Sequence, residues 1–241
     1  VAYPDMPHGQ SWNFGTLSDG SAGFGYAEPT PYGLTSAPIV QSYSPSLDTL
    51  AEFPPSGFYS TPFAVALPEN ATVRCEQGGI APTASSPVTT ALQIINTTVI
   101  RCASFVAGAH PGNELNRTYI FEDAPTAPAI FLTANPNSLF HPDSGIYMEG
   151  NFAQEKEPHY GANYWLDKEI PVTVELLELG TSRPVFEKQA GLKIFGNYSR
   201  QNDKKSVVIT FREKYGDKRL KYPLFPAFPE LKRFNAFIFR S

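Results

Sequence analysis

The sequence is poor in cysteine and in long apolar runs, and its first half lacks lysine. Two cysteines among 241 residues are too few for a disulfide scaffold or for a zinc site built from paired Cys-x-x-Cys motifs. The longest apolar runs are far shorter than the ~20 residues that a membrane-spanning helix needs. Residues 1–4 have neither a basic start nor an apolar segment, so we expect any signal peptide to have been removed or to lie upstream. We therefore expect no membrane span and no metal site.

Basic residues are scarce over the first 150 positions. This part holds twelve acidic residues and three arginines, a net charge of −9, whereas residues 151–241 hold eleven acidic and sixteen basic residues, a net charge of +5. The first lysine is Lys156. Such a division predicts more than one domain. In the second part lysines alternate with acidic residues along the chain, so no continuous basic stripe forms and we expect no nucleic-acid partner.

Glycine and proline are abundant, and they separate many short strand-like segments. Together they make 41 of 241 residues, about 17% against a usual ~12%. Residues 51–123 hold five short strand-like segments about ten residues apart, which predicts a β-sandwich. A proline-rich linker is predicted at 124–137. Residues 138–241 hold longer strand-like segments and no convincing amphipathic helix, so we expect a mostly β chain that ends in an antiparallel sheet; the segments are 170–177, 190–195, 206–212 and 234–240.

The two cysteines each follow an arginine inside a strand-like segment. Neighbouring strands of one sheet would bring Cys75 and Cys102 together, and a disulfide there would contribute about 3 kcal/mol in the chain-entropy model. Such a bond requires an oxidising compartment. The alternative is a pair of buried free thiols that act as small hydrophobic side chains. The sequence leaves both interpretations open.

Two groups of motifs in the first half resemble known modules. Aromatic segments around the turn Asp19-Gly20, followed by Thr30-Pro31-Tyr32-Gly33, resemble the end of a lamin tail domain (LTD) of bacterial surface proteins. The resemblance covers about 35 residues, and residues 1–50 are predicted to hold this LTD-like segment and a linker. The segment Thr97-Thr98-Val99-Ile100-Arg101-Cys102-Ala103-Ser104-Phe105 and a Gly/Pro-Thr turn at 78–83 resemble the chitobiase/β-hexosaminidase C-terminal-type domain. That resemblance implies an immunoglobulin-like (Ig-like) β-sandwich at residues 51–123.

Residues 138–241 carry the most specific motifs. Phe140-x-x-Asp143-x-Gly145-Ile146-Tyr147 is followed by Gly191-Leu192-Lys193-Ile194-Phe195-Gly196-Asn197-Tyr198-Ser199-Arg200 and then by Lys204-Lys205-Ser206. In this order they resemble the N-terminal part of the kinase-like family of spore coat protein H (CotH). The resemblance implies a sheet-rich partial N-lobe of an atypical protein kinase, truncated at residue 241. It also implies that the full-length parent takes ATP with Mg²⁺ or Mn²⁺.

The resemblance implies roles for four residues of the last motif. Arg200, Lys204 and Lys205 are candidates for contacts with nucleotide phosphates, and Ser199 would shape the turn beneath them. The alternative is an ordinary solvated hairpin loop with basic residues on its exposed face. In the family the magnesium-binding and catalytic acids come later in the chain, so we expect no catalytic residue, no cofactor and no activity in these 241 residues.

Two functions follow as expectations. In the first, the chain is a fragment of a secreted or cell-envelope CotH-like protein of bacteria, catalytically incomplete by itself, whose partner would be a protein substrate. In the second, it is a non-catalytic envelope module that binds polysaccharide or a partner protein, or acts as a spacer. Both place the chain outside the cell or in the cell envelope.

Overall fold

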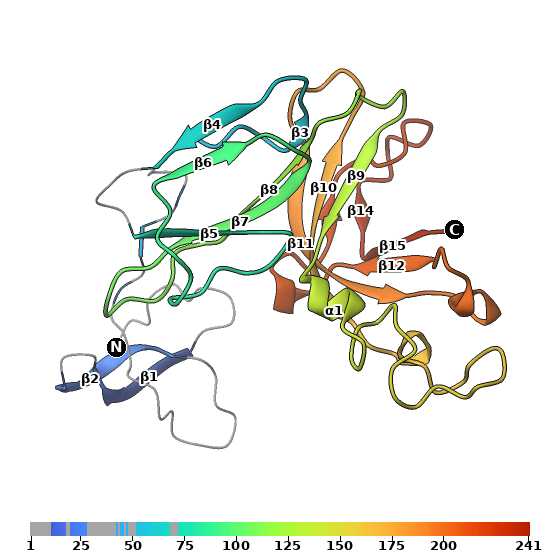
Figure 1. Cartoon of the computed structure of the whole chain (residues 1–241), viewed down its shortest axis with the longest axis horizontal. Helices are drawn as coiled ribbons and strands as arrows, with labels where there is room; N and C mark the ends of the chain where they lie inside the picture. Colours follow the sequence, from blue (N-terminus) through green and yellow to red (C-terminus); the bar gives the residue numbers. More distant parts are fainter. Residues whose placement is uncertain are drawn as a thin grey trace. The chain divides into compact units, whose positions relative to one another are not determined.

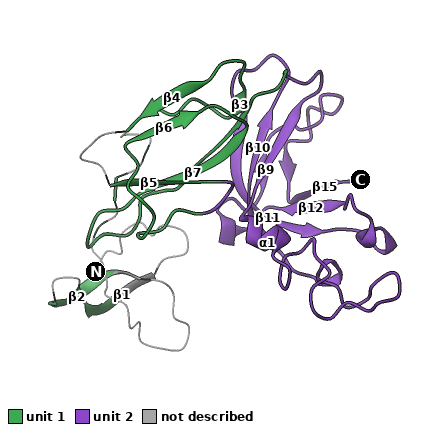
Figure 2. Cartoon of the chain, in the orientation of Figure 1, with its two compact units in different colours: residues 1–77, 81–123 green, residues 78–80, 124–241 purple. Residues whose placement is uncertain are grey.

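The computed structural model describes residues 11–17, 20–27, 42, 44–45, 47, 52–67 and 72–241. The chain is mostly β, with several antiparallel sheets and short helical turns, which confirms the predicted fold class. It divides into two compact units (Figures 1 and 2): unit 1 is residues 1–77 and 81–123, and unit 2 is residues 78–80 and 124–241. Over the described residues, every helix is too short or too polar to cross a membrane.

Unit 1 starts with a two-stranded hairpin. Strands β1 (Ser11–Thr16) and β2 (Ala22–Ala27) pair antiparallel. Phe14 lies opposite Phe24 with ring centroids 5.0 Å apart, a cross-strand aromatic contact. This hairpin and single positions after it are the described part of the segment predicted as lamin-tail-like, and Thr30-Pro31-Tyr32-Gly33 lies outside the described residues.

The larger part of unit 1 consists of two sheets around one core. One sheet has the order β3-β8-β7-β5 and the other pairs β4 with β6. The strands are β3 (Gly57–Phe58), β4 (Phe63–Ala66), β5 (Val73–Gln77), β6 (Ala91–Ile94), β7 (Thr98–Ser104) and β8 (Leu115–Ile120). Buried side chains from both sheets form the core, among them Val65, Ile94, Ile100 and Tyr119. The Tyr119 hydroxyl donates to the Pro54 carbonyl at 3.0 Å, which satisfies this polar group inside the core.

The two cysteines face each other across neighbouring strands of the four-stranded sheet. Cys75 in β5 is opposite Cys102 in β7, with Cα atoms 4.1 Å apart, and the two form a disulfide. Cys102 is fully buried in the core of unit 1. The bond closes a loop with a sequence separation of 27 residues, so it restricts the unfolded chain as well as joining the two strands.

Unit 2 is built on a five-stranded antiparallel sheet of order β15-β12-β11-β10-β9. These strands are β9 (Ala129–Thr133), β10 (Ile170–Leu177), β11 (Phe186–Ile194), β12 (Val207–Thr210) and β15 (Ala236–Phe239); β13 (Leu220–Lys221) and β14 (Arg233–Phe234) form a separate pair. One short helix, α1 (Pro136–Phe140), and the 3-10 turns η2 (Asn163–Trp165), η3 (Tyr198–Gln201) and η4 (Glu213–Tyr215) lie in the connections. The core is lined mainly by β10, β11 and β12, for example Val174, Leu192 and Ile209.

The segment predicted as a linker contains a strand of this sheet. Within 124–137, Ala129–Thr133 forms β9 and pairs with β10, with Phe131 opposite Glu175. Five strand-forming residues stand between Pro128 and Pro136, and the flanking prolines favoured a linker over this short apolar run. Pro136 opens α1, where a missing backbone N–H costs nothing.

Candidate functional site

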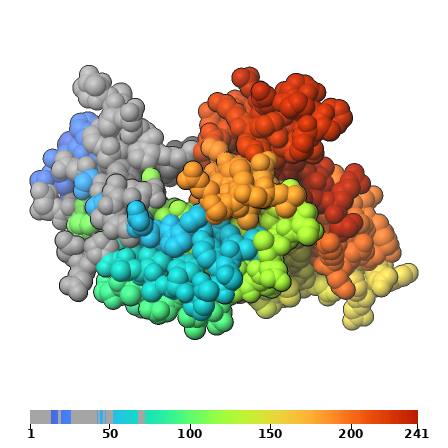
Figure 3. Space-filling view, turned by 90° about the horizontal axis from the view of Figure 1, so that it is seen from above, coloured from blue at the N-terminus to red at the C-terminus, as the bar shows by residue number. Residues whose placement is uncertain are grey.

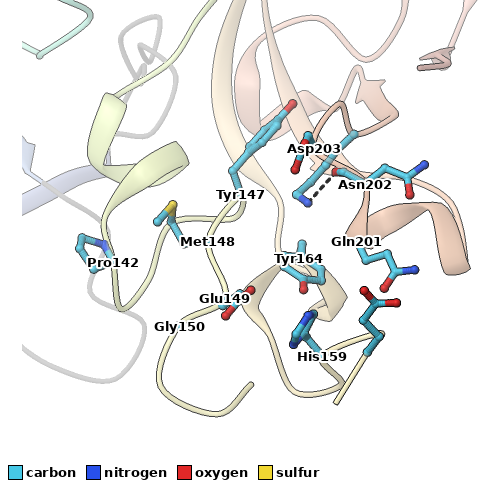
Figure 4. Close-up of a pocket in the computed structure, with 12 residues that line it drawn as sticks. Pro142, Tyr147, Met148, Glu149, Gly150, His159, Tyr164, Gln201, Asn202 and Asp203 are labelled. Carbon is cyan, nitrogen blue, oxygen red and sulfur yellow. Dashed lines mark hydrogen bonds between the residues drawn. The ribbon is translucent and has the colours of Figure 1, made fainter. Parts of the chain in front are cut away.

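A pocket of about 770 Å³ lies in unit 2, where the irregular segment between β9 and β10 meets η3 and the turn after it. Figure 4 shows its walls, with residues 142–164 on one side and residues 201–205 on the other. It is lined by Pro142, Tyr147, Met148, Glu149, Gly150, Glu157, His159, Tyr164, Gln201, Asn202, Asp203 and Lys205. We call it the Lys205 pocket.

One buried amide holds the first wall in place. The Asn163 side chain donates from Nδ2 to the carbonyl oxygens of Asp143 and Gly145, at 3.1 and 3.2 Å, and its backbone N–H donates to the Glu149 carbonyl at 3.0 Å. Gly150 has φ +71°, and a Cβ there would lie 2.5 Å from Asn163 Oδ1. Only glycine at position 150 therefore lets this loop close on Asn163.

The second part of the wall is held by contacts between the loop and η2. Trp165 Nε1 donates to the Pro158 carbonyl at 2.9 Å, and its ring lies 5.0 Å from that of Tyr160. His159 Nδ1 lies 2.9 Å from the Gln154 carbonyl oxygen. These contacts fix a segment without regular structure, and they place Glu157 and His159 on the pocket wall.

Arg200 holds η3 against η2 and does not line the pocket. Its Nε donates to the Gly196 carbonyl at 2.7 Å, and its Nη1 donates to the carbonyls of Tyr164 and Trp165 at 3.1 and 3.4 Å. The guanidinium group thus donates its hydrogen bonds to main-chain carbonyls, two of which lie about 35 residues earlier in the sequence. Arginine suits this position because its planar group offers several donors in fixed directions.

Of the four residues implied by the CotH resemblance, Lys205 lines the pocket. Ser199 lies at the turn, where a Cβ at Gly196 would be 2.5 Å from its hydroxyl oxygen, and Lys204 is exposed. Neither is among the lining residues. The structure therefore separates the group: one lysine faces the pocket, one arginine braces the backbone, and the other two lie outside.

The Lys205 ammonium is fixed by three contacts. It donates to the carbonyls of Arg200 and Asn202 at 2.8 and 3.0 Å, and it lies 4.1 Å from the centroid of the Tyr164 ring. Burial lowers the pKa of Lys205, while the charges of Asp203 and Glu149 act in the opposite direction. The result is a partly desolvated cation with a defined position.

The lining as a whole is acidic. Glu149, Glu157 and Asp203 face one ammonium group, that of Lys205. Burial raises the pKa of the Tyr164 hydroxyl, and the Glu149 charge raises it further, so this group stays protonated at neutral pH. In the part of the chain that the structure describes, no group of three or more His, Cys, Asp or Glu side chains could hold a metal ion by itself.

From the sequence, Lys205 was identified as a site residue through the Lys204-Lys205-Ser206 motif, but most of the other residues that line the pocket were not identified. Glu157, His159 and Tyr164 come from an irregular segment in which neither a helical nor a strand period marks the side that faces inward. The nearest usable signal was the group of small and turn-forming residues around Gly145 and Gly150, which indicates a tightly folded loop.

Comparisons with known proteins gave no match, whether against protein-family models, curated proteins or solved structures.

Proposed function

We propose that the chain is part of a secreted or cell-envelope CotH-like protein, and that the Lys205 pocket receives the phosphates of ATP together with Mg²⁺ or Mn²⁺. One observation carries the proposal: Lys205, from the motif that resembles the CotH family, is the one lysine or arginine among the residues that line this pocket. Its ammonium is held in place by carbonyls rather than neutralised by a carboxylate.

The charges of the lining determine the form of the ligand. Glu149, Glu157 and Asp203 would repel a free triphosphate. A divalent cation removes that repulsion, and Mg²⁺ is ordinarily held by one or two carboxylates with phosphate oxygens and water as its other ligands. Lys205 would supply the charge that contacts the phosphates. We therefore expect affinity for the metal complex and little for ATP alone.

The proposal assigns no catalytic residue to these 241 residues. After Arg200 the acidic residues are Asp203, Glu213, Asp217 and Glu230, and none of them forms an Asp-x-Asp or Asp-x-x-x-x-Asn motif. Phosphoryl transfer depends on acids that hold the metal and position the attacking group. We expect binding without turnover, and an activity, if the parent protein has one, that depends on further residues.

The disulfide supports the proposed location. Bonds such as Cys75–Cys102 persist in oxidising compartments and are rare in the cytosol. A bacterial cell envelope or the extracellular space provides that environment. The sandwich of unit 1, proposed to be Ig-like, would then act as an accessory or spacer domain that precedes most of unit 2 in the sequence.

A second candidate is a non-catalytic envelope module that binds polysaccharide or a partner protein. Two features favour it. The lining is acidic, and the Lys205 ammonium already donates two hydrogen bonds to main-chain carbonyls, which leaves fewer donors for a phosphate. The carboxylates of the lining, together with Tyr147 and Tyr164, are a suitable set of acceptors and donors for the hydroxyl groups of a sugar.

Thermal unfolding of the chain with ATP distinguishes the two candidates. At ten times the dissociation constant, a ligand stabilises the folded state by about 1.4 kcal/mol. For a chain of this size that raises Tm by roughly 3–5 °C. We expect this rise with ATP plus Mg²⁺ or Mn²⁺ at millimolar concentration, and a much smaller one with ATP alone.

Two neighbouring lysines provide a matched pair of variants. Lys205→Met removes the cation that lines the pocket, and Lys204→Met removes an equal charge from the exposed position beside it. The Tm rise should disappear in the first variant and persist in the second. No rise in the unsubstituted chain, with binding on a glycan array that Lys205→Met does not change, would establish the second candidate instead.

A further inference from the structure

Unit 2 has a second pocket, of opposite charge to the first. Its volume is about 460 Å³, and it lies where the end of β12 meets η4 and the approach to β13. It is lined by Thr210, Phe211, Arg212, Glu213, Lys214, Lys218, Arg219 and Asn235. Four of the eight side chains are basic and one is acidic, so the lining carries a net charge of +3. We call it the basic pocket.

The Glu169 carboxylate binds two of the four cations of this pocket, Arg212 and Lys214. Glu169 accepts from Arg212 Nε at 3.1 Å, from Lys214 Nζ at 3.0 Å and from the Tyr215 hydroxyl at 3.1 Å. Burial by itself would raise the pKa of Glu169, but the hydrogen bonds from Lys214, Tyr215 and Arg212 outweigh it and lower the pKa. The Glu169 carboxylate packs against Gly191 of β11, where a Cβ would lie 2.4 Å from its Cδ.

The other two cations are available. Within the described residues, neither Lys218 nor Arg219 forms a hydrogen bond or an ion pair, and both side chains are exposed. The acidic neighbour Asp217 does not neutralise them, because its carboxylate forms an ion pair with Lys188. Gly216, with φ +125°, turns the chain at this point in a conformation that favours glycine.

Even with Glu169 included, the cluster carries four basic and two acidic groups, a net charge of +2. The space-filling view shows part of the C-terminal segment, in red, at the surface (Figure 3). All four basic side chains of the pocket are exposed, so an anion can reach them. An arginine beside a lysine suits a phosphate group in particular, since the guanidinium can bind two of its oxygens at once.

We propose that the basic pocket binds a phosphate-bearing anion, with Lys218 and Arg219 as its direct ligands and Arg212 and Lys214 held beside it by Glu169. The volume lies within the range of small-molecule sites, so a diphosphate or a phosphate ester fits better than a bare ion. The phosphate can belong to a small molecule or to a phosphate polymer. The site is separate from the Lys205 pocket and does not depend on its proposed function.

Titration calorimetry of the whole 241-residue chain with sodium diphosphate at low ionic strength tests the proposal. The double variant Lys218→Gln/Arg219→Gln removes the proposed ligands. Lys221→Gln/Lys232→Gln removes the same charge from two exposed side chains that are not among the lining residues. We expect diphosphate binding to weaken at least tenfold in the first double variant and less than twofold in the second.

Three further measurements complete the test. Binding should survive in Lys205→Met, which separates this pocket from the first one. Long-chain polyphosphate that binds much more tightly than diphosphate identifies a polymer as the source of the phosphate, and equal affinities identify a small molecule. The exchanged side chains are exposed, and circular dichroism checks that each variant is folded. No diphosphate binding, or equal weakening in both double variants, would overturn the proposal.

Discussion

Replacement of Asn163 by Asp changes the chemistry of one side chain in the wall of the Lys205 pocket and leaves its size almost unchanged. The asparagine side chain donates to the carbonyls of Asp143 and Gly145, and only about 6% of the residue is exposed. A carboxylate of the same size cannot donate, and it brings a negative charge toward two carbonyl oxygens. Asn163→Asp should therefore open the loop 143–150 and destabilise unit 2.

The contacts set the size of the effect. Each hydrogen bond contributes about 0.5–1.5 kcal/mol net, and a buried group left without a partner costs about 1–3 kcal/mol more. Two lost bonds and two carbonyls without donors give a total of at least about 3 kcal/mol at pH 7. A protonated carboxyl can donate again, so the folded state raises the pKa of the introduced group. The loss should then be smallest below the pKa of the unfolded chain and grow as the pH rises through the folded pKa.

Urea unfolding followed by tryptophan emission measures this loss. The chain has two tryptophans, and Trp12→Phe leaves Trp165, which is two residues from Asn163, as the reporter of unit 2. Asn151→Asp is the matched control, because Asn151 is exposed in the same irregular segment. Equal stabilities of the two Asp variants at pH 7, or a loss in Asn163→Asp that does not shrink at pH 4, would refute the proposed role of the amide.

Three other perturbations test contacts that stabilise the two units. Gly191→Ala places a Cβ 2.4 Å from the Glu169 Cδ and should cost about 1–3 kcal/mol in urea unfolding, with a smaller cost in a Glu169→Ala background. Cys75→Ser/Cys102→Ser opens a loop of 27 residues and should lower the unfolding free energy by about 3.5 kcal/mol in the entropy model; a reductant should destabilise the parent chain but not this variant. Hydrogen bonds lower the pKa of Glu169 by more than burial raises it. The contribution of Glu169 to the free energy of unfolding is therefore present above the pKa of the unfolded chain and is lost as the pH falls through the folded pKa. Glu169→Gln should therefore flatten the acid side of the stability profile, and an unchanged profile would contradict this.

The strands of the molecule were largely predictable, because alternation and β-branched residues are local signals. The segment 170–177 was predicted as a strand and forms β10 with the same bounds, and 206–212 contains β12. Strand β9 was missed, since its five residues lie between Pro128 and Pro136 and carry too short a signal to outweigh these prolines. Short apolar segments depend on a partner strand that the local sequence does not identify.

The pockets were less predictable, because their geometry depends on contacts between distant residues. The motif offered three cations, Arg200, Lys204 and Lys205, for one role, and in the structure they lie in different surroundings. Arg200 donates to carbonyls about 35 residues away, which no local pattern reveals. The basic pocket was missed because its lysines and Arg219 stand beside Glu213 and Asp217 in the sequence, which suggests that the charges cancel. In the structure Asp217 forms an ion pair with Lys188, so it does not neutralise the cations of the pocket.

The disulfide of unit 1 also determines how the chain behaves under tension. A pull on its two ends unfolds the strands, but the bond between Cys75 and Cys102 keeps the residues between them from extending. At ~3.5 Å per extended residue, those 27 positions amount to about 90 Å of hidden length. When the chain is stretched, reduction of this one bond would lengthen the molecule by that amount without breaking its backbone.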